Sequence, residues 1–206
     1  KSSKKLTLSA KNFIIATGSS SMERPGITVD EKQIVTSTGA LSLSAVPKTM
    51  LVIGGGYIGL EMGSVWSRLG TKVTVVEKLD RIVPTMDGEI ATEFMKSLQK
   101  QGLEFKLSHK VVATKSESKD VEVTMESEKD KKQIKDKFNV VLMSIGRKPN
   151  TEELNLEKIG VKLNDQKAIE VDQQFKTSVD GIYAIGDVAP GPMLAHKAEE
   201  EGIACV

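Results

Sequence analysis

The stretch LVIGGGYIGLEMGSVWSRLGTKVTVVEK, residues 51–78, determines the expected fold. Its two apolar runs belong to segments 49–53 and 72–76, which are rich in β-branched residues and typical of strands buried on both faces of a parallel sheet. Between them, apolar residues recur every three or four positions and Gly70 follows, which predicts an amphipathic helix over 57–69. The apolar stripe of this helix is expected to consist of Ile58, Met62, Val65, Trp66 and Leu69.

The alternation of strand and helix continues beyond this stretch. A second helix is expected over 87–100 and a third strand over 104–107, so the order is βαβαβ. This order indicates a right-handed, doubly wound α/β unit.

The second half of the chain is expected to add strands of other kinds. Segments 110–118 and 120–128 alternate polar and apolar residues, which predicts antiparallel strands. The charge-rich segment 128–137 is interpreted as a hairpin tip, and 138–145 as a fully apolar strand. Two more strand-like pieces follow the chain breakers of the GRKPN segment, at 167–172 and 181–188.

Three glycines, Gly54, Gly56 and Gly59, form the pattern G-x-G-x-x-G between a predicted strand and a predicted helix. In the dinucleotide fingerprint, the first glycine makes a tight turn, the second lets the backbone approach a pyrophosphate, and the third lets the helix lie close to the strand. The phosphates then bind free N–H groups at the helix N-terminus. The pattern therefore predicts a dinucleotide site, and it fits FAD and NAD equally.

An acid stands where the fingerprint expects one. Glu77 ends the second strand, at the distance of about 20 residues that places a carboxylate on the adenosine ribose. A carboxylate repels a 2′-phosphate, which favours NAD(H) over NADP(H), although the neighbouring cation of Lys78 weakens that preference.

Helical geometry also places Glu61 on the stripe facing the sheet, where a carboxylate is costly unless it is paired or functional. The alternative is that Glu61 extends from the stripe edge into solvent.

Composition limits the classes of function. The chain has 206 residues with 29 Lys plus Arg and 28 Asp plus Glu, so no net field would draw it to nucleic acid or an anionic membrane. Its apolar runs are far shorter than the roughly 18 residues of a spanning helix, which predicts a soluble protein. The single cysteine, Cys205, excludes an internal disulfide framework and fits a reducing compartment. No metal site is predicted. Because the chain starts without methionine and ends within a helical pattern, we expect it to be a segment of a longer protein.

Four ordered motifs, IIATGS, GGGYIGLEMGSVWSRLG, SIGRKPN and YAIGDVAPGPMLAHKAEEEG, resemble those of the dihydrolipoamide dehydrogenase family. These flavoproteins are the E3 components of 2-oxo acid dehydrogenase complexes. The plant mitochondrial form looks especially similar, as does the nearly identical group described as ferric leghemoglobin reductase. It implies a Rossmann-like NAD domain of three-layer ββα type, with flanking parts of an FAD domain. The implied division is 1–41 for a flavin-domain segment, 42–148 for the NAD domain and 149–206 for a second flavin-domain segment.

The resemblance assigns the glycine loop to NAD. It implies that Tyr57 covers the nicotinamide pocket and that Glu61 lies near the nicotinamide, where it supports catalysis. It also implies that Gly146 and Arg147 line the nicotinamide side. The residues assigned to NAD are Gly54, Gly56, Tyr57, Ile58, Gly59, Glu61, Glu77, Gly146 and Arg147.

The resemblance assigns the flanks to FAD. Asp187 would accept hydrogen bonds from the flavin ribitol, and a helix beginning near Met193 would point its N-terminal amides at the flavin pyrimidine. His196 is interpreted as a bystander and His109 as a surface loop residue. The residues assigned to FAD are Thr17, Gly18, Gly186, Asp187, Met193, Leu194, Ala195 and His196.

Two catalytic parts of the family are missing from this sequence. It has neither the redox disulfide C-x-x-x-x-C nor the His–Glu pair that acts as general base, so no catalytic residue is assigned and the chain alone is not expected to oxidise dihydrolipoamide. The implied whole enzyme is a homodimeric dihydrolipoyl dehydrogenase of the mitochondrial matrix, which acts on lipoamide-bearing proteins and binds no nucleic acid or membrane. Two alternatives stay open: a related NADH-dependent reductase such as ferric leghemoglobin reductase, and a nucleotide-binding module without activity.

Overall fold

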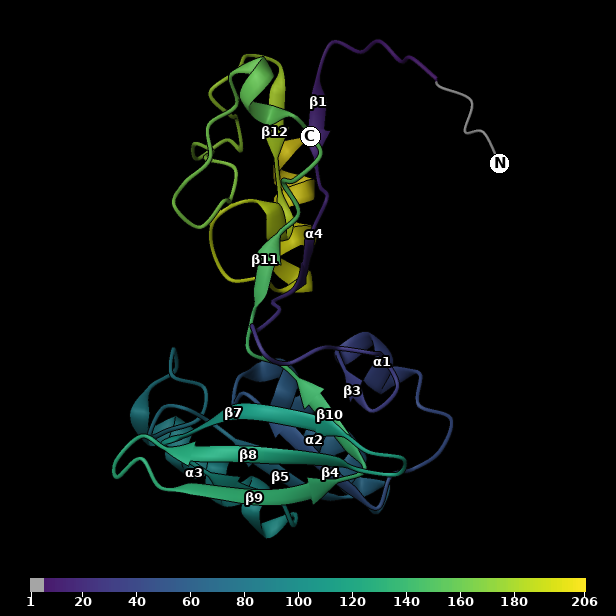
Figure 1. The fold of residues 1–206 in the computed structure, drawn as a ribbon. Helices are drawn as coiled ribbons and strands as arrows, with labels where there is room; N and C mark the ends of the chain where they lie inside the picture. The colour runs from purple at the N-terminus through teal and green to yellow at the C-terminus, as the bar shows by residue number, and fades with distance from the viewer. Residues whose placement is uncertain (1–5) are drawn as a thin grey trace. The chain divides into compact units, whose positions relative to one another are not determined.

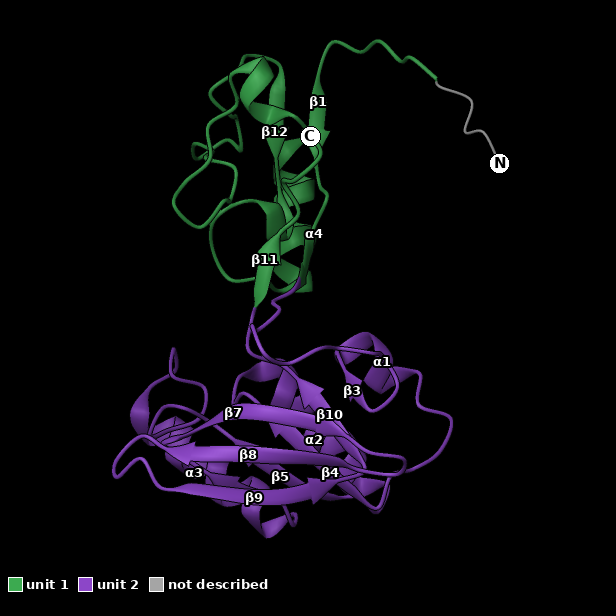
Figure 2. Cartoon of the chain, viewed as in Figure 1, with its two compact units in different colours: residues 1–20, 147–206 green, residues 21–146 purple. Residues whose placement is uncertain are grey.

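A computed structural model describes residues 6–206 and divides them into two compact units. The central unit is Ser21–Gly146, and the flanking unit combines the described residues up to Ser20 with Arg147–Val206 (Figure 2). The elements in chain order are β1 (Phe13–Ile15), β2 (Ser19–Ser21), β3 (Ile34–Val35), α1 (Ser37–Leu41), β4 (Thr49–Ile53), α2 (Tyr57–Arg68), β5 (Lys72–Val76), α3 (Gly88–Lys100), β6 (Glu104–Lys106), β7 (His109–Ser116), β8 (Val121–Ser127), β9 (Gln133–Phe138), β10 (Val140–Met143), β11 (Arg147–Pro149), η1 (Leu156–Ile159), β12 (Ile182–Ala184), η2 (Gly186–Val188) and α4 (Ala195–Cys205).

The unit boundaries differ from the implied domain boundaries. Residues 21–41 lie in the central unit rather than in a flavin-domain segment, because β3 pairs with β10 at the edge of the central sheet. The second boundary falls after Gly146, two residues before the expected position.

The central unit has three layers, as predicted. Its core is a five-stranded parallel sheet in the order β3-β10-β4-β5-β6. Strands β7, β8 and β9 form an antiparallel sheet on one face, and helices α2 and α3 lie on the other (Figure 1). This is the expected Rossmann-like fold of ββα type.

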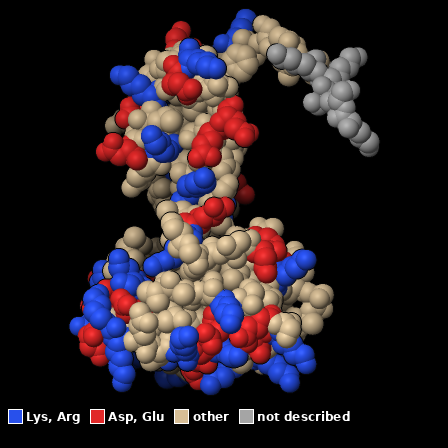
Figure 3. Space-filling model, in the orientation of Figure 1, with Lys and Arg blue, Asp and Glu red and all other residues tan. Residues whose placement is uncertain are grey.

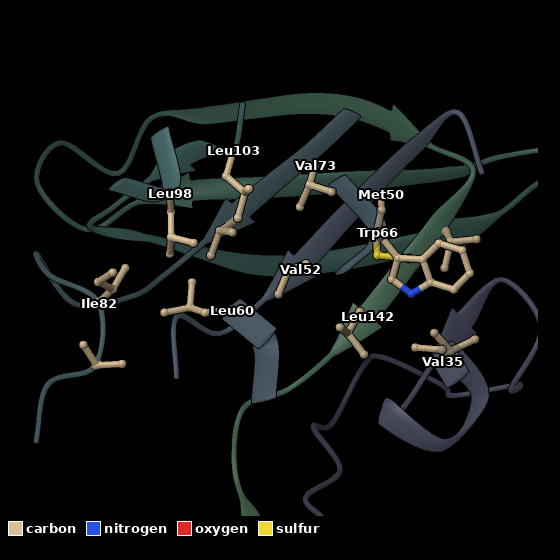
Figure 4. Packing of buried hydrophobic residues seen from close by; sticks show 14 of the residues in the cluster. Val35, Met50, Val52, Leu60, Trp66, Val73, Ile82, Leu98, Leu103 and Leu142 are labelled. Atoms are coloured by element: carbon tan, nitrogen blue, oxygen red, sulfur yellow. The ribbon is translucent and has the colours of Figure 1, made fainter. Parts of the chain in front are cut away.

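Alternation along the central strands explains the layers, because successive side chains of a strand point to opposite faces. Met50 and Val52 of β4 belong to the cluster that includes Leu60 and Trp66 of α2 (Figure 4). Leu51 and Ile53 of β4 belong to the cluster on the opposite face, together with side chains from β7, β8 and β9. Each such fully buried side chain contributes about 1.5–3 kcal/mol to folding.

The buried face of α2 differs from the predicted stripe. Gly59, Leu60, Gly63 and Trp66 are buried, whereas Val65 and Leu69 of the predicted stripe are exposed. The two glycines let the helix backbone approach the sheet closely, and this turns the contact face away from Val65 and Leu69.

Several strand predictions need correction. Segment 133–137 is not a hairpin tip: it belongs to β9, because its backbone pairs with β8. The apolar strand expected over 138–145 is shorter, since Phe138 ends β9 and only Val140–Met143 form β10. Segment 167–172 contributes only an isolated bridge between Leu163 and Ile169.

The flanking unit contains short elements. Strand β1 pairs in parallel with β12, β2 pairs with β11, and a cluster around Leu156, Ile169 and Val188 forms its core. Among residues 6–206, no helix is long and apolar enough to cross a membrane. On the visible face of the central unit, positive and negative side chains are interspersed rather than gathered by sign (Figure 3).

Candidate functional site

The loop between β4 and α2 starts with a glycine that the backbone requires. Gly54 has a φ of +108°, and a Cβ added to it would lie 2.4 Å from the carbonyl oxygen of Ser144. Its amide donates to the carbonyl of Val76 at 2.9 Å, which joins the carboxyl ends of β4 and β5. Gly54 thus makes the tight turn expected of the first fingerprint glycine.

Gly59 is the tightest of the three positions. A Cβ there would lie 2.3 Å from the carbonyl oxygen of Gly54, 2.6 Å from Ser144 Oγ and 2.9 Å from Val52 Cγ1. No side chain fits, so the absence of one allows the first turn of α2 to lie against β4.

Gly56 is different, because neither its backbone nor its neighbours require glycine. Its φ of −83° suits any residue, and a Cβ would meet nothing within 4 Å. Gly56 is the N-cap of α2 and has no side chain to accept hydrogen bonds from the first-turn amides. The open space and the free amides together form a cradle for an anionic group.

Glu77 joins this loop to the end of β5. Its Oε2 accepts a hydrogen bond from the amide of Gly55 at 2.6 Å, and its Oε1 accepts one from Leu79 at 2.8 Å. Each carboxylate oxygen has a further lone pair, so Glu77 can still accept from a ligand hydroxyl.

A cavity of about 220 Å³ adjoins Gly54 and Glu77. Sequence reasoning missed most of its wall, which comes from segments distant in sequence. His109 was expected in a surface loop, and this expectation was wrong. It is the half-buried first residue of β7 and lines this cavity. The newly found lining residues are Arg24, Ile53, Val76, Leu79, His109, Lys110, Val111 and Ile145.

The charges at this cavity differ in how they are compensated. Lys110 Nζ lies 3.0 Å from Glu126 and 3.3 Å from Glu128. The hydrogen bonds that it donates to Glu126, the larger cause, and to Glu128 raise the pKa of Lys110. Lys78 and Arg24 form no ion pair with any residue of the described range 6–206. The cavity therefore offers both an acceptor, Glu77, and uncompensated positive charge.

The predicted nicotinamide residues on α2 are at the surface. Tyr57 is 46% exposed, and its hydroxyl lies 2.9 Å from Thr85 Oγ1. Ile58 is half-buried. Glu61 is exposed, so its placement on the face toward the sheet was wrong and the solvent alternative holds. The cause is the same rotation of the contact face toward Gly59 and Gly63.

In the flanking unit, the Ala-Thr-Gly turn directly follows β1. The hydroxyl of Thr17 donates to the carbonyl of Asn150 at 2.7 Å, and Asn150 Nδ2 donates to the carbonyl of Thr17 at 3.0 Å. Gly18 has a φ of +72°, which favours glycine. Asn150 is the last residue of the SIGRKPN motif, but the sequence analysis had given it no role.

Asp187 lies in η2, just after β12, beside two side chains of the same unit. Ser19 Oγ donates to Asp187 Oδ2 at 2.5 Å, and Arg147 Nε donates to Ser19 Oγ at 2.6 Å. Arg147 also donates to the Ser19 carbonyl, and its Nε lies 3.9 Å from Asp187 Oδ2. Arg147 had been assigned to NAD with Gly146, but this geometry groups it with Asp187. Ser19 is the last residue of the IIATGS motif, but it had been given no role because its partners Arg147 and Asp187 are distant in sequence.

Helix α4 starts slightly later than expected. It begins at Ala195 with Leu194 as N-cap, whereas the start had been expected near Met193. The Leu194 amide had been predicted as a free donor, but it donates to the carbonyl of Pro192 at 3.0 Å. The first-turn amides of Ala195 and His196 remain. The His196 side chain is exposed.

Nowhere in residues 6–206 do three His, Cys, Asp or Glu side chains gather to hold a metal.

The Rossmann-like fold and the glycine loop define the class of dinucleotide-binding α/β proteins. Residues 1–202 match the pyridine nucleotide-disulphide oxidoreductase family, and the chain belongs to this family. This family agrees with the resemblance that the four sequence motifs indicated.

Curated relatives narrow the likeness further. The chain is 57% identical over 196 residues to the mitochondrial dihydrolipoyl dehydrogenase of Pisum sativum, covering 95% of this chain and 39% of the relative. It is 56% identical over 196 residues to leghemoglobin reductase of Glycine max, covering 95% and 38%. The chain thus spans about two fifths of the length of these relatives.

Solved structures are similar in fold. The flavoprotein disulfide reductase RclA from Escherichia coli, in a Cu(II) complex, has a TM-score of 0.83 at 29% identity over 94% of this chain and 44% of that chain. LpdA from Mycobacterium tuberculosis has a TM-score of 0.83 at 30% identity, covering 93% and 40%.

Proposed function

We propose that the chain is the NAD-binding part, with adjoining FAD-binding segments, of a dihydrolipoyl dehydrogenase. The observation that carries the proposal is the cradle at Gly56, whose open space and free helix amides lie beside the carboxylate of Glu77. The relatives named dihydrolipoyl dehydrogenase support it.

The central unit fits NAD. The first-turn amides of α2 hold the pyrophosphate, Glu77 accepts from the adenosine ribose, and the cavity of about 220 Å³ takes the adenosine end. Gly54, Ile58 and Gly59 shape the loop, while Tyr57, Glu61 and Gly146 face the nicotinamide half.

The flanking unit fits part of FAD. Ser19 holds the Asp187 carboxylate, which would accept from the ribitol, and the amides of Ala195 and His196 would stabilise negative charge on the pyrimidine. Thr17, Gly18, Gly186 and Met193 shape the surrounding turns. When bound, the two cofactors supply hydride transfer between flavin and nicotinamide. The chain's own residues bind and orient the two groups, since reaction requires them at contact distance.

We further propose that the whole protein is a mitochondrial homodimer that acts on lipoamide-bearing proteins of 2-oxo acid dehydrogenase complexes. The mitochondrial names of the plant relatives support this location. A second candidate is a leghemoglobin reductase, because a relative of that name is 56% identical to this chain. Steady-state assays of the full-length protein with dihydrolipoamide and with ferric leghemoglobin distinguish the two activities.

Calorimetry of the 206-residue chain with NADH tests the cradle. The parent chain is expected to bind, and Gly56→Val is expected to lose binding because its side chain fills the open space. Gly88→Val is a matched control, since Gly88 also starts a helix and its added Cβ would only touch Arg81 at 3.5 Å. Equal NADH affinity of the parent and Gly56→Val would contradict the proposal. An inactive module is supported if NADH binds but the full-length protein neither oxidises dihydrolipoamide nor reduces ferric leghemoglobin.

A further inference from the structure

An ion pair on α4 is unusually buried for its kind. Lys197 Nζ lies 2.7 Å from Glu201 Oε1, and both side chains are only 16% exposed. In every other ion pair within residues 6–206, both side chains are more exposed than this. Burying two charges costs desolvation energy that their attraction often fails to recover, so stability alone does not account for the pair.

The pair holds both backbone polar groups of Gly186, the residue before Asp187. Glu201 Oε2 accepts from the Gly186 amide at 2.7 Å, and Lys197 Nζ donates to the Gly186 carbonyl at 3.4 Å. Gly186 has a φ of +72°, and an added Cβ would lie 3.1 Å from the Ala198 Cβ. The turn therefore lies directly on α4 and is fastened there by the N–H and C=O groups of one residue.

Other attachments of α4 are few. None of its residues is buried, and its N-cap Leu194 forms no side-chain cap. Ala198 lies close to Gly186, Gly202 lies close to Ile185, and the side chain of Lys197 lies close to Gly191. The polar contacts of Glu201 and Lys197 add directional bonds to these approaches and so help to fix the helix along the turn.

We propose that Glu201, oriented by Lys197, is a positioning residue that fixes the Asp187 carboxylate relative to the N-terminus of α4. This proposal rests on the proposed flavin site, in which Asp187 accepts from the ribitol and the α4 amides face the pyrimidine. The two contacts involve adjoining parts of one ligand, so both form well only if their spacing is held. The Gly186 amide is the point at which Glu201 sets that spacing.

Two substitutions in the full-length protein separate reach from charge. Glu201→Gln keeps an oxygen that can accept from the Gly186 amide but loses the charge, whereas Glu201→Asp keeps the charge but is too short to reach. We expect Glu201→Asp to weaken FAD binding about tenfold and to shift the visible absorption spectrum of the bound flavin. Glu201→Gln is expected to retain most of the affinity and the parent spectrum. The matched controls are Glu200→Asp and Glu200→Gln, because Glu200 is an exposed neighbour on the same helix.

The readouts are FAD affinity by flavin fluorescence, the flavin spectrum, and thermal unfolding of the apoprotein. A purely structural ion pair would make Glu201→Gln the worse variant and would move only the unfolding temperature, and this result overturns the proposal. Equal FAD affinity and spectrum in both Glu201 variants also overturns it. If the parent itself binds no FAD, the proposed flavin site fails first, and this failure is visible without any variant.

Discussion

The carboxylate of Glu77 accepts a hydrogen bond from the Gly55 amide at 2.6 Å, which fixes the acid at the end of β5 against the glycine loop at the end of β4. A second hydrogen bond, from Leu79 at 2.8 Å, holds the other oxygen. Glu77 therefore supports the loop as well as offering lone pairs to the cavity, and these two roles make different demands on a substitution.

The two roles of Glu77 can be separated with Ala and Gln. Glu77→Ala is expected to weaken NADH binding about tenfold or more, because it removes both the ribose acceptor and the loop support. Glu77→Gln keeps one acceptor oxygen for the Gly55 amide and is expected to lose less. Both variants lose the charge that repels a 2′-phosphate, so the preference for NADH over NADPH should fall in both.

Fluorescence titration of each variant with NADH and NADPH measures this preference. Glu104→Gln is the control, since Glu104 is on the neighbouring strand β6 and pairs with Lys72 at 3.0 Å rather than lining the cavity. A ratio of the two affinities that stays at the parent value in Glu77→Ala would remove Glu77 from the ribose.

The glycines of the fingerprint should differ sharply in their effect on stability. Gly59→Ala places a methyl group where three atoms lie within 3 Å, and we expect it to lower the free energy of unfolding by about 1–3 kcal/mol. Gly56→Ala meets no atom within 4 Å and has an ordinary φ, so its effect should stay within about 0.5 kcal/mol. Urea unfolding of both variants tests this, and similar losses at the two positions would contradict the assigned geometry.

Stability at acid pH should depend on Asp30. Its Oδ1 accepts from the amides of Lys32, Gln33 and Ile34 at 2.8, 2.8 and 2.9 Å. Partial burial raises the pKa of Asp30, but these backbone hydrogen bonds together outweigh it and lower the pKa below its usual value. A lowered pKa in the folded state means that the stabilisation is complete above the unfolded pKa of about 3.9 and is lost as the pH falls through the folded value.

Unfolding of the parent chain and Asp30→Ala at several pH values measures this contribution. The parent should be more stable by about 1 kcal/mol at pH 7, and the difference should shrink below about pH 4. Asp30→Asn keeps one acceptor oxygen without titrating, so its stability relative to Asp30→Ala should not depend on pH. A parent advantage that grows toward acid pH would refute the role of the carboxylate.

The sequence predicted the centre of the fold closely. The observed β4 and β5 have the predicted bounds, Thr49–Ile53 and Lys72–Val76. Central parallel strands are buried on both faces, so they appear as unbroken apolar runs that end where a glycine or an acid begins. The glycine spacing then identified the loop, because its conformation depends on local backbone geometry.

Features that depend on distant partners were predicted poorly. Segment 133–137 ends in three consecutive charged residues, Lys135, Asp136 and Lys137. It still forms a strand, because β8 supplies its hydrogen bonds. The exposed position of Glu61 follows from how closely α2 approaches the sheet, which an apolar count does not reveal. His109 reaches the cavity because its amide donates to the carbonyl of Glu77, the residue after β5. Each miss concerns a residue whose surroundings come from another part of the chain.

Asp187 and Ser19 should affect flavin binding to different degrees in the full-length protein. Asp187→Ala removes the acceptor itself and is expected to weaken FAD binding most. In Ser19→Ala the carboxylate loses a 2.5 Å hydrogen bond, and Arg147, now 3.9 Å away, can close on it and occupy it. An ion pair with Arg147 would compete with the ribitol hydroxyls, so a loss of about tenfold is expected. Ser19→Thr keeps the hydroxyl and should bind FAD like the parent. Flavin retention on dilution ranks the variants, and retention in Asp187→Ala equal to the parent would exclude Asp187 from the flavin site.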